Sequence, residues 1–179
     1  MVEIGQQAFN QDSALKTINL LDTKVTTLGQ DAFAYNTALE LSRLPDTLIY
    51  IGVRAFHECR NITISDIPQS VTVIREQGFM GCSKVNVSEL GKGQPLEVGY
   101  RAFSYTGKFA SSTESIKINS PVIFTKNSDN EMGVFVESFT SNLKDLYTYS
   151  SFGYDGNDSA LVADLFGPLV DGITVHILK

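Results

Sequence analysis

Few side chains in this sequence could carry covalent or metal chemistry. The only histidines are His57 and His176, and the only cysteines are Cys59 and Cys82. A nucleophilic triad needs its members within hydrogen-bond reach, and a structural zinc ion needs about four ligands. His57 could join the cysteines as a third ligand, but no fourth is evident, and no nucleophile elbow, phosphate loop or His-Glu-x-x-His helix occurs. We predict no catalytic residue, no metal site and no cofactor, and therefore no enzyme.

Two polar loops, residues 126–131 and 153–158, carry oxygen atoms of the kind that Ca²⁺ prefers. The oxygen-bearing residues are Asn127, Asp129, Glu131, Asp155, Asn157 and Asp158. The same residue types also favour tight turns. We interpret both loops as solvated turns.

The sequence repeats one short phrase, in which Ile, Leu or Val followed by Gly precedes an Ala-Phe pair. It occurs at Ile4–Phe9, Leu28–Phe33, Ile51–Phe56 and Val98–Phe103, with a degraded copy at Ile74–Phe79. The five phenylalanines lie 24, 23, 23 and 24 residues apart. Such regular spacing indicates a repeat architecture.

Further apolar residues recur at fixed distances from each phenylalanine. They are Leu15, Leu39, Ile62 and Val85, then Leu20, Leu44, Ile67 and Leu90, and after a turn Val25, Leu48, Val71 and Leu96. The pattern therefore predicts that each coil consists of a short apolar strand, a turn, a second short strand ending at Gly, and a compact helical turn. We expect the Gly to permit a backbone conformation that other residues resist, and the Phe to fill the coil interior. A lone coil cannot cover both its faces, so the coils must stack.

The phrase resembles that of the BspA-like leucine-rich-repeat family, Leu-x-x-Ile-x-Ile-Pro…Val-x-x-Ile-Gly-x-x-Ala-Phe-x-x-Cys. The best copies run from Leu48 to Cys59 and from Val71 to Cys82. The resemblance implies a right-handed, mostly β solenoid of about 23-residue coils with short helical turns. It also implies a secreted or surface-anchored bacterial protein with a part in adhesion, for some members through extracellular-matrix binding. The two cysteines would then be small buried residues in adjacent coils, with a disulfide between them as the alternative.

The regular coils are predicted to cover residues 1–107. Residues 108–179 depart from the pattern and read as divergent final coils and a C-terminal cap of the same solenoid, with strands at Ile116–Ile118, Asn142–Ser150 and Ile173–Ile177. A separate small domain is the alternative. The first residues lie mid-repeat, so we expect a fragment that lacks an export signal and earlier coils.

The sequence does not decide which side chains of the first strand in each coil face the core and which face outward. If Ser42, Ser65 and Ser88 face inward, a second set of residues forms an exposed apolar binding stripe. That set is Leu41, Ile64 and Val87. A one-residue slip of the strand exchanges the two sets, so that the apolar residues face in and the serines face out.

Two further groups could contact a partner. Arg43, Asp66 and Glu89 form a mostly polar strip beside these serines, spaced 23 residues apart. Tyr147 and Tyr149 flank Thr148 on a late strand and would share one sheet face. Tyrosine is favoured at interfaces, but it is also an ordinary strand residue.

The composition narrows the classes of partner. The net charge is −6, which argues against a nucleic-acid surface, and no apolar run approaches the roughly 20 residues of a membrane-spanning helix. We predict a non-enzymatic binding module at the cell surface or outside the cell, with a protein or glycan ligand such as a host matrix protein. A structural spacer that displays another domain is the alternative, and an enzyme is the remote one.

Overall fold

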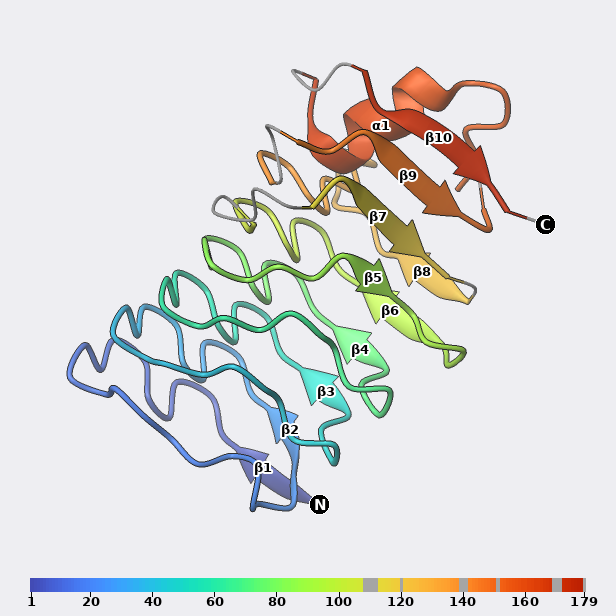
Figure 1. The fold of residues 1–179 in the computed structure, drawn as a ribbon. Coiled ribbons are helices and arrows are strands. Elements are labelled where there is room, and N and C mark those ends of the chain that lie inside the picture. The colour runs from blue at the N-terminus through green and yellow to red at the C-terminus, as the bar shows by residue number, and fades with distance from the viewer. Residues whose placement is uncertain (108–112, 120, 139–141, 151, 169–171, 179) are drawn as a thin grey trace.

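The recurring Ile-Gly phrase forms a short strand in each coil, and these strands pair into the longer of two parallel sheets. The computed structural model describes residues 1–107, 113–119, 121–138, 142–150, 152–168 and 172–178. The six strands of the first sheet, in spatial order, are β1 (Val2–Ile4), β2 (Val25–Leu28), β3 (Tyr50–Ile51), β4 (Val73–Ile74), β6 (Leu96–Val98) and β8 (Val122–Phe124). They follow one another along the stack in Figure 1.

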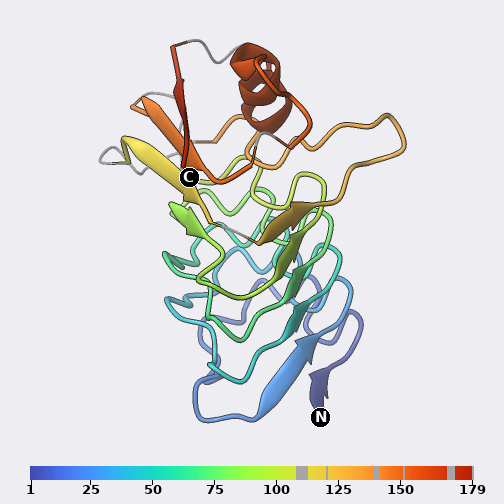
Figure 2. The same ribbon diagram turned by 90° about the vertical axis from the view of Figure 1, so that its right-hand side faces the viewer.

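A second parallel sheet forms on another side of the stack (Figure 2). Its strands, in spatial order, are β10 (Thr174–Ile177), β9 (Asp145–Thr148), β7 (Ser115–Ile118) and β5 (Glu89–Leu90). The late strands predicted from the sequence around residues 116–118, 142–150 and 173–177 correspond to β7, β9 and β10. The solenoid predicted from the repeat is therefore confirmed as a β-rich stack of coils.

The first apolar segment of each regular coil does not form the predicted strand in the coils before β5. Neighbouring coils are joined there by single hydrogen bonds, such as the bond of 2.8 Å from the Thr63 amide to the Leu41 carbonyl. The inward-facing residues of one such segment are Leu39, Leu41 and Leu44, all 7 % exposed or less. Their spacing of two and then three residues breaks the strict alternation that a continuous strand requires.

A column of stacked phenylalanine rings runs through the interior of the coils. Successive ring centroids lie 5.2–5.7 Å apart from Phe9 to Phe166. Phe135 and Phe166 extend the five rings of the repeat into the divergent part of the chain. Because each ring covers the next, the core is completed only between coils.

The recurring glycine of the phrase has a different role from the one predicted. Its backbone φ is not positive at Gly29, Gly52 or Gly99. A Cβ atom at Gly29 would instead lie 2.7 Å from the Gln6 amide nitrogen, and one at Gly99 would lie 2.4 Å from that of Glu76. At Gly29, Gly52 and Gly99 neighbouring coils approach too closely for a side chain, whereas the degraded copy carries Arg75 at the equivalent position.

The left-handed backbone positions fall in the Ala-Phe turn and are occupied mostly by other residues. In the second coil they are Asp31, with φ 55°, and Tyr35, with φ 64°. Within the turn, an amide donates to the carbonyl three residues earlier, as in the bond of 3.2 Å from the Ala34 amide to the Asp31 carbonyl. The left-handed residues interrupt the helical geometry after each turn, so the predicted helical turn does not propagate into a helix.

A nine-residue helix, α1 (Asp158–Phe166), covers the C-terminal end of the stack and was not predicted from the sequence (Figure 1). Its buried face consists of Leu161, Val162, Leu165 and Phe166. Asn157 caps its first turn by accepting a hydrogen bond of 3.2 Å from the Ala160 amide. The amide of Gly133 donates to the Asp164 carbonyl at 2.7 Å, which ties the helix to the last coil.

Candidate functional site

The outward side of the second sheet gathers most of the residues that the sequence singled out for binding. The strand register places Glu89 beside Lys117, Lys117 beside Tyr147, and Tyr147 beside His176. Asp66 and Arg43 occupy the Glu89 position in the two preceding coils, and both are exposed. We call this side, from Arg43 to His176, the outer face.

The charged residues of the outer face contact one another across coils. The Glu89 carboxylate lies 3.6 Å from Lys117 Nζ and accepts a hydrogen bond of 2.9 Å from the Asn119 amide. Asp66 forms an ion pair with Lys92. These contacts balance positive and negative charge along the face, so it presents no strong field of either sign.

At the aromatic end of the outer face, Tyr147 packs against His176, a histidine that the sequence analysis considered only for catalysis. The Tyr147 and His176 rings stack with centroids 4.5 Å apart and planes 12° apart. His176 Nε2 lies 2.7 Å from Asp145 Oδ1. The alternation of the β10 sequence was the signal that could have placed His176 beside Tyr147. Tyr147 is half-buried by this contact, whereas Tyr149 is 43 % exposed.

The apolar stripe proposed as one alternative is wrong. Leu41, Ile64 and Val87 are 7 %, 0 % and 1 % exposed, respectively, and belong to the core. The serines that follow them face outward, since Ser42 and Ser65 are exposed. Burying the three aliphatic side chains is favourable at about 1.5–3 kcal/mol each, which selects this register over the other.

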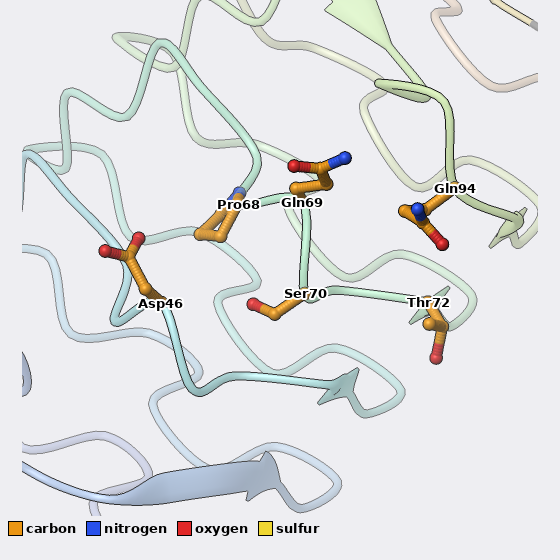
Figure 3. A pocket seen from close by; sticks show the side chains of 6 residues that line it. All are labelled: Asp46, Pro68, Gln69, Ser70, Thr72 and Gln94. Atoms are coloured by element: carbon orange, nitrogen blue, oxygen red, sulfur yellow. The ribbon is translucent and has the colours of Figure 1, made fainter.

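Shallow hollows line the edge of the stack where the chain turns from the outer-face segment into the first sheet. Figure 3 shows the hollow that spans three consecutive coils. Its lining residues are Asp46, Pro68, Gln69, Ser70, Thr72 and Gln94. The Ser70 hydroxyl oxygen is buried and has no hydrogen-bond partner within the described residues. A buried hydroxyl without a partner is uncommon.

Comparison with known families accounts for this architecture. The family model described as BspA type Leucine rich repeat region matches residues 2–130 with six copies. The chain belongs to the BspA-type leucine-rich-repeat family. The matched BspA-type region runs past residue 107, and the division of the chain at that residue stays a prediction. Neither the curated proteins nor the solved structures contain a match to this chain.

BspA-type membership supports a repeat-protein module. Leucine-rich-repeat families are typically non-enzymatic, and BspA-type repeats are generally associated with bacterial surfaces. The structure contains, among its described residues, no helix with the length and apolar character of a membrane span.

The cysteines of the BspA-type phrase are packed into the core. Both thiols are free and fully buried, and Cys59 Sγ lies 2.9 Å from the Phe33 carbonyl oxygen. Cys82 Sγ lies 2.8 Å from the Phe56 carbonyl oxygen, one coil further along. Burial raises the pKa of the Cys59 thiol to about 12 and that of Cys82 well above its ordinary value. The cysteines therefore serve as small core residues, and the disulfide alternative does not hold.

The oxygen-rich loops form local turns. Asn127 Oδ1 accepts hydrogen bonds from the amides of Asp129 and Glu131 at 3.0 and 2.9 Å. Asn157 is the cap of α1. In the described part of the chain, no group of three or more His, Cys, Asp or Glu residues could hold a metal ion.

Proposed function

We propose that this chain is a non-enzymatic binding module of a bacterial cell-surface or secreted protein, and that its outer face contacts a protein or glycan ligand in adhesion. The observation that carries the proposal is the row of outward side chains from Arg43 through Asp66 and Glu89 to Tyr147. They come from coils far apart in the sequence but lie along one side of the stack. A rigid stack holds such a row with little conformational entropy to lose on binding.

The location of the row suits a macromolecular partner rather than a small substrate. Stacked phenylalanines fill the interior of the coils, so the described residues enclose no deep cavity there for a reacting molecule. An exposed row of polar and aromatic groups can instead contact a surface or a chain. Matrix proteins of a host, such as fibronectin and fibrinogen, are the protein ligands that we would test first.

The test compares binding of the chain to immobilised fibronectin and fibrinogen with binding by two triple variants. The first variant carries Arg43→Ala, Asp66→Ala and Glu89→Ala. The matched control carries Lys24→Ala, Glu3→Ala and Glu76→Ala, which removes the same charges from exposed residues on other sides of the stack. We expect the first variant to lose binding and the control to retain it.

Two outcomes contradict the proposal. Equal binding by both variants would show that the outer face is not the contact surface. If the chain binds neither these proteins nor any glycan, it acts as a structural spacer that displays another domain.

A further inference from the structure

The hollows at the edge of the stack lie next to one another and share lining residues. The hollow in Figure 3 shares Gln69 and Gln94 with a very small cavity beneath the edge, which the core residues Ile67, Val71 and Leu96 also line. That one shares Glu89 and Lys92 with a third, and the third shares Tyr149 with a fourth beside α1. We call this series of hollows, which runs from Asp46 to Ile177, the edge track.

We propose that the edge track binds an extended, uncharged oligosaccharide, with the Tyr149 ring as the platform on which one sugar ring stacks. This inference rests on the proposed function as a binding module and names the class of ligand and its site. The edge track lies beside the outer face and shares Glu89 with it.

Tyr149 has the position that a stacking platform needs. It is 43 % exposed and lines hollows on two sides, so its ring can be reached from both. Asn119 lies between Tyr149 and Gly91, because the Asn119 amide donates to the Leu90 carbonyl at 2.9 Å and the register pairs Ile118 with Thr148. Gly93 lines one of these hollows and has no atom within 4 Å of the place of a side chain, so the space beside it is open. The electron-rich face of an aromatic ring attracts the C–H groups on the apolar face of a pyranose.

The polar groups of the edge track match sugar hydroxyls, which both donate and accept hydrogen bonds. The track presents the side-chain amides of Gln69, Gln94 and Asn119. The Asn119 side-chain nitrogen already donates to Glu89 and to the Leu90 carbonyl, so Asn119 offers its amide oxygen as an acceptor. The Gln69 amide nitrogen donates to the Lys92 carbonyl at 3.0 Å, which fixes the side chain in place.

The geometry of the stack favours a chain over a single sugar. Neighbouring coils of a parallel solenoid lie about 4.8 Å apart, close to the advance of one sugar in an extended polysaccharide. Each coil along the edge can therefore present its polar group to a successive sugar. A linear ligand would contact Gln69, Gln94, Asn119 and Tyr149 in that order.

The charges of the edge track select against anionic glycans. The cations nearest the track are engaged with carboxylates, Lys92 with Asp66 and Lys117 with Glu89. The ends of the track carry Asp46 and Asp158, which would repel sulfate groups. An uncharged polysaccharide meets no such penalty.

The experiment is affinity electrophoresis of the whole chain in native gels that contain laminarin, mannan or hydroxyethylcellulose, with a heparin gel for comparison. We expect at least one uncharged polysaccharide to retard the chain and heparin to leave its mobility unchanged. Tyr149→Ala should raise the dissociation constant by about tenfold, and Gln94→Ala should raise it less. Tyr149→Trp should keep the retardation, because it preserves the stacking surface.

The matched control is Tyr35→Ala, since Tyr35 is 45 % exposed but lies on the Ala-Phe turn, away from the edge track. The inference is overturned if no uncharged polysaccharide retards the chain, if Tyr149→Ala and Tyr35→Ala behave alike, or if heparin alone retards it. Matrix-protein binding that depends on Arg43, without any polysaccharide binding, would overturn this inference and leave the proposed function standing.

Discussion

Gly52 lies against the carbonyl oxygen of Leu28 in the preceding coil, where an added Cβ atom would be only 2.7 Å away. The Gly52 amide donates to the same oxygen at 2.9 Å, so the two backbones are held at this distance by a hydrogen bond. The absence of a side chain at Gly52 thus allows these two coils to stack closely.

Gly52→Ala should therefore destabilise the chain by about 1–3 kcal/mol, because the coils must separate to admit the methyl group. Urea denaturation followed by circular dichroism measures the loss. The matched control is Gly5→Ala at the same repeat position in the first coil, where nothing beyond its own chain neighbours lies within 4 Å. The control should change stability by less than about 0.5 kcal/mol. Equal losses at the two positions would contradict the close-approach explanation.

The two cysteines should be unreactive in the folded chain. Burial raises the pKa of Cys59 to about 12, so almost no thiolate is present at neutral or mildly basic pH. A thiol reagent such as DTNB at pH 8 should react with both only as fast as the chain unfolds. A Ser42→Cys variant provides the comparison, since residue 42 is exposed and its thiol should react at once. Rapid modification of the unaltered chain would show that the core opens near the cysteines.

The stability of the chain should fall on mild acidification because of His57. Burial lowers the pKa of His57 below its ordinary value of 6.5. The unfolded chain therefore takes up a proton at a higher pH than the folded chain does, and stability decreases as the pH falls through 6.5. His57→Gln should lose less stability than the unaltered chain between pH 7.5 and pH 5, as measured by urea midpoints. The two chains differ only at residue 57, so a difference in pH dependence is assigned to His57. The same pH dependence in both would contradict the prediction.

The C-terminal helix should depend on one hydroxyl. Tyr154 donates a hydrogen bond to the Asp164 side chain, and Asp164 Oδ1 also accepts a bond of 2.8 Å from the Met132 amide. This hydrogen bond to Asp164 raises the pKa of Tyr154 to about 12. Tyr154→Phe should cost about 1–2 kcal/mol at pH 7 and increase hydrogen exchange in α1.

The pH dependence has a definite sign for this tyrosine. The stability that its hydroxyl contributes is present below the ordinary tyrosine pKa of 10.0 and is lost as the pH rises through about 12. An ultraviolet titration should therefore lose one late tyrosinate step in Tyr154→Phe. Tyr149→Phe serves as the control and should leave both that step and the exchange of α1 unchanged.

Much of the fold could be predicted from the sequence because the same physical demand recurs in every coil. Phe33 and Phe56 fill equivalent positions, and the structure stacks their rings 5.4 Å apart. The sequence could not show why glycine occurs in the Ile-Gly phrase. A positive backbone φ and a close approach of the neighbouring coil would both favour glycine at that position. It also could not predict α1, because Asp158–Phe166 lies outside the repeat and its buried face is defined by the last coil.

The candidate site also has a part that the sequence predicted and a part that it did not. The polar strip with Arg43 and Glu89 followed from the period of the repeat, and Tyr147 and Tyr149 followed from alternation on a strand. The edge track did not follow from the sequence, because Tyr149 and Gly93 lie 56 positions apart in the chain and line one hollow only in the folded stack.

The sequence by itself determined that the chain is a stack of repeated coils, because a period of about 23 residues places the same apolar residues at the same point of every turn. Only the tertiary structure decided which way the column with Leu41 and Ser42 faces, since a one-residue slip exchanges the two faces without changing the period. It also decided which coils bring Glu89, Asn119 and Tyr149 together. Those contacts depend on how coils of unequal length stack, and the spacing along the chain does not contain that information.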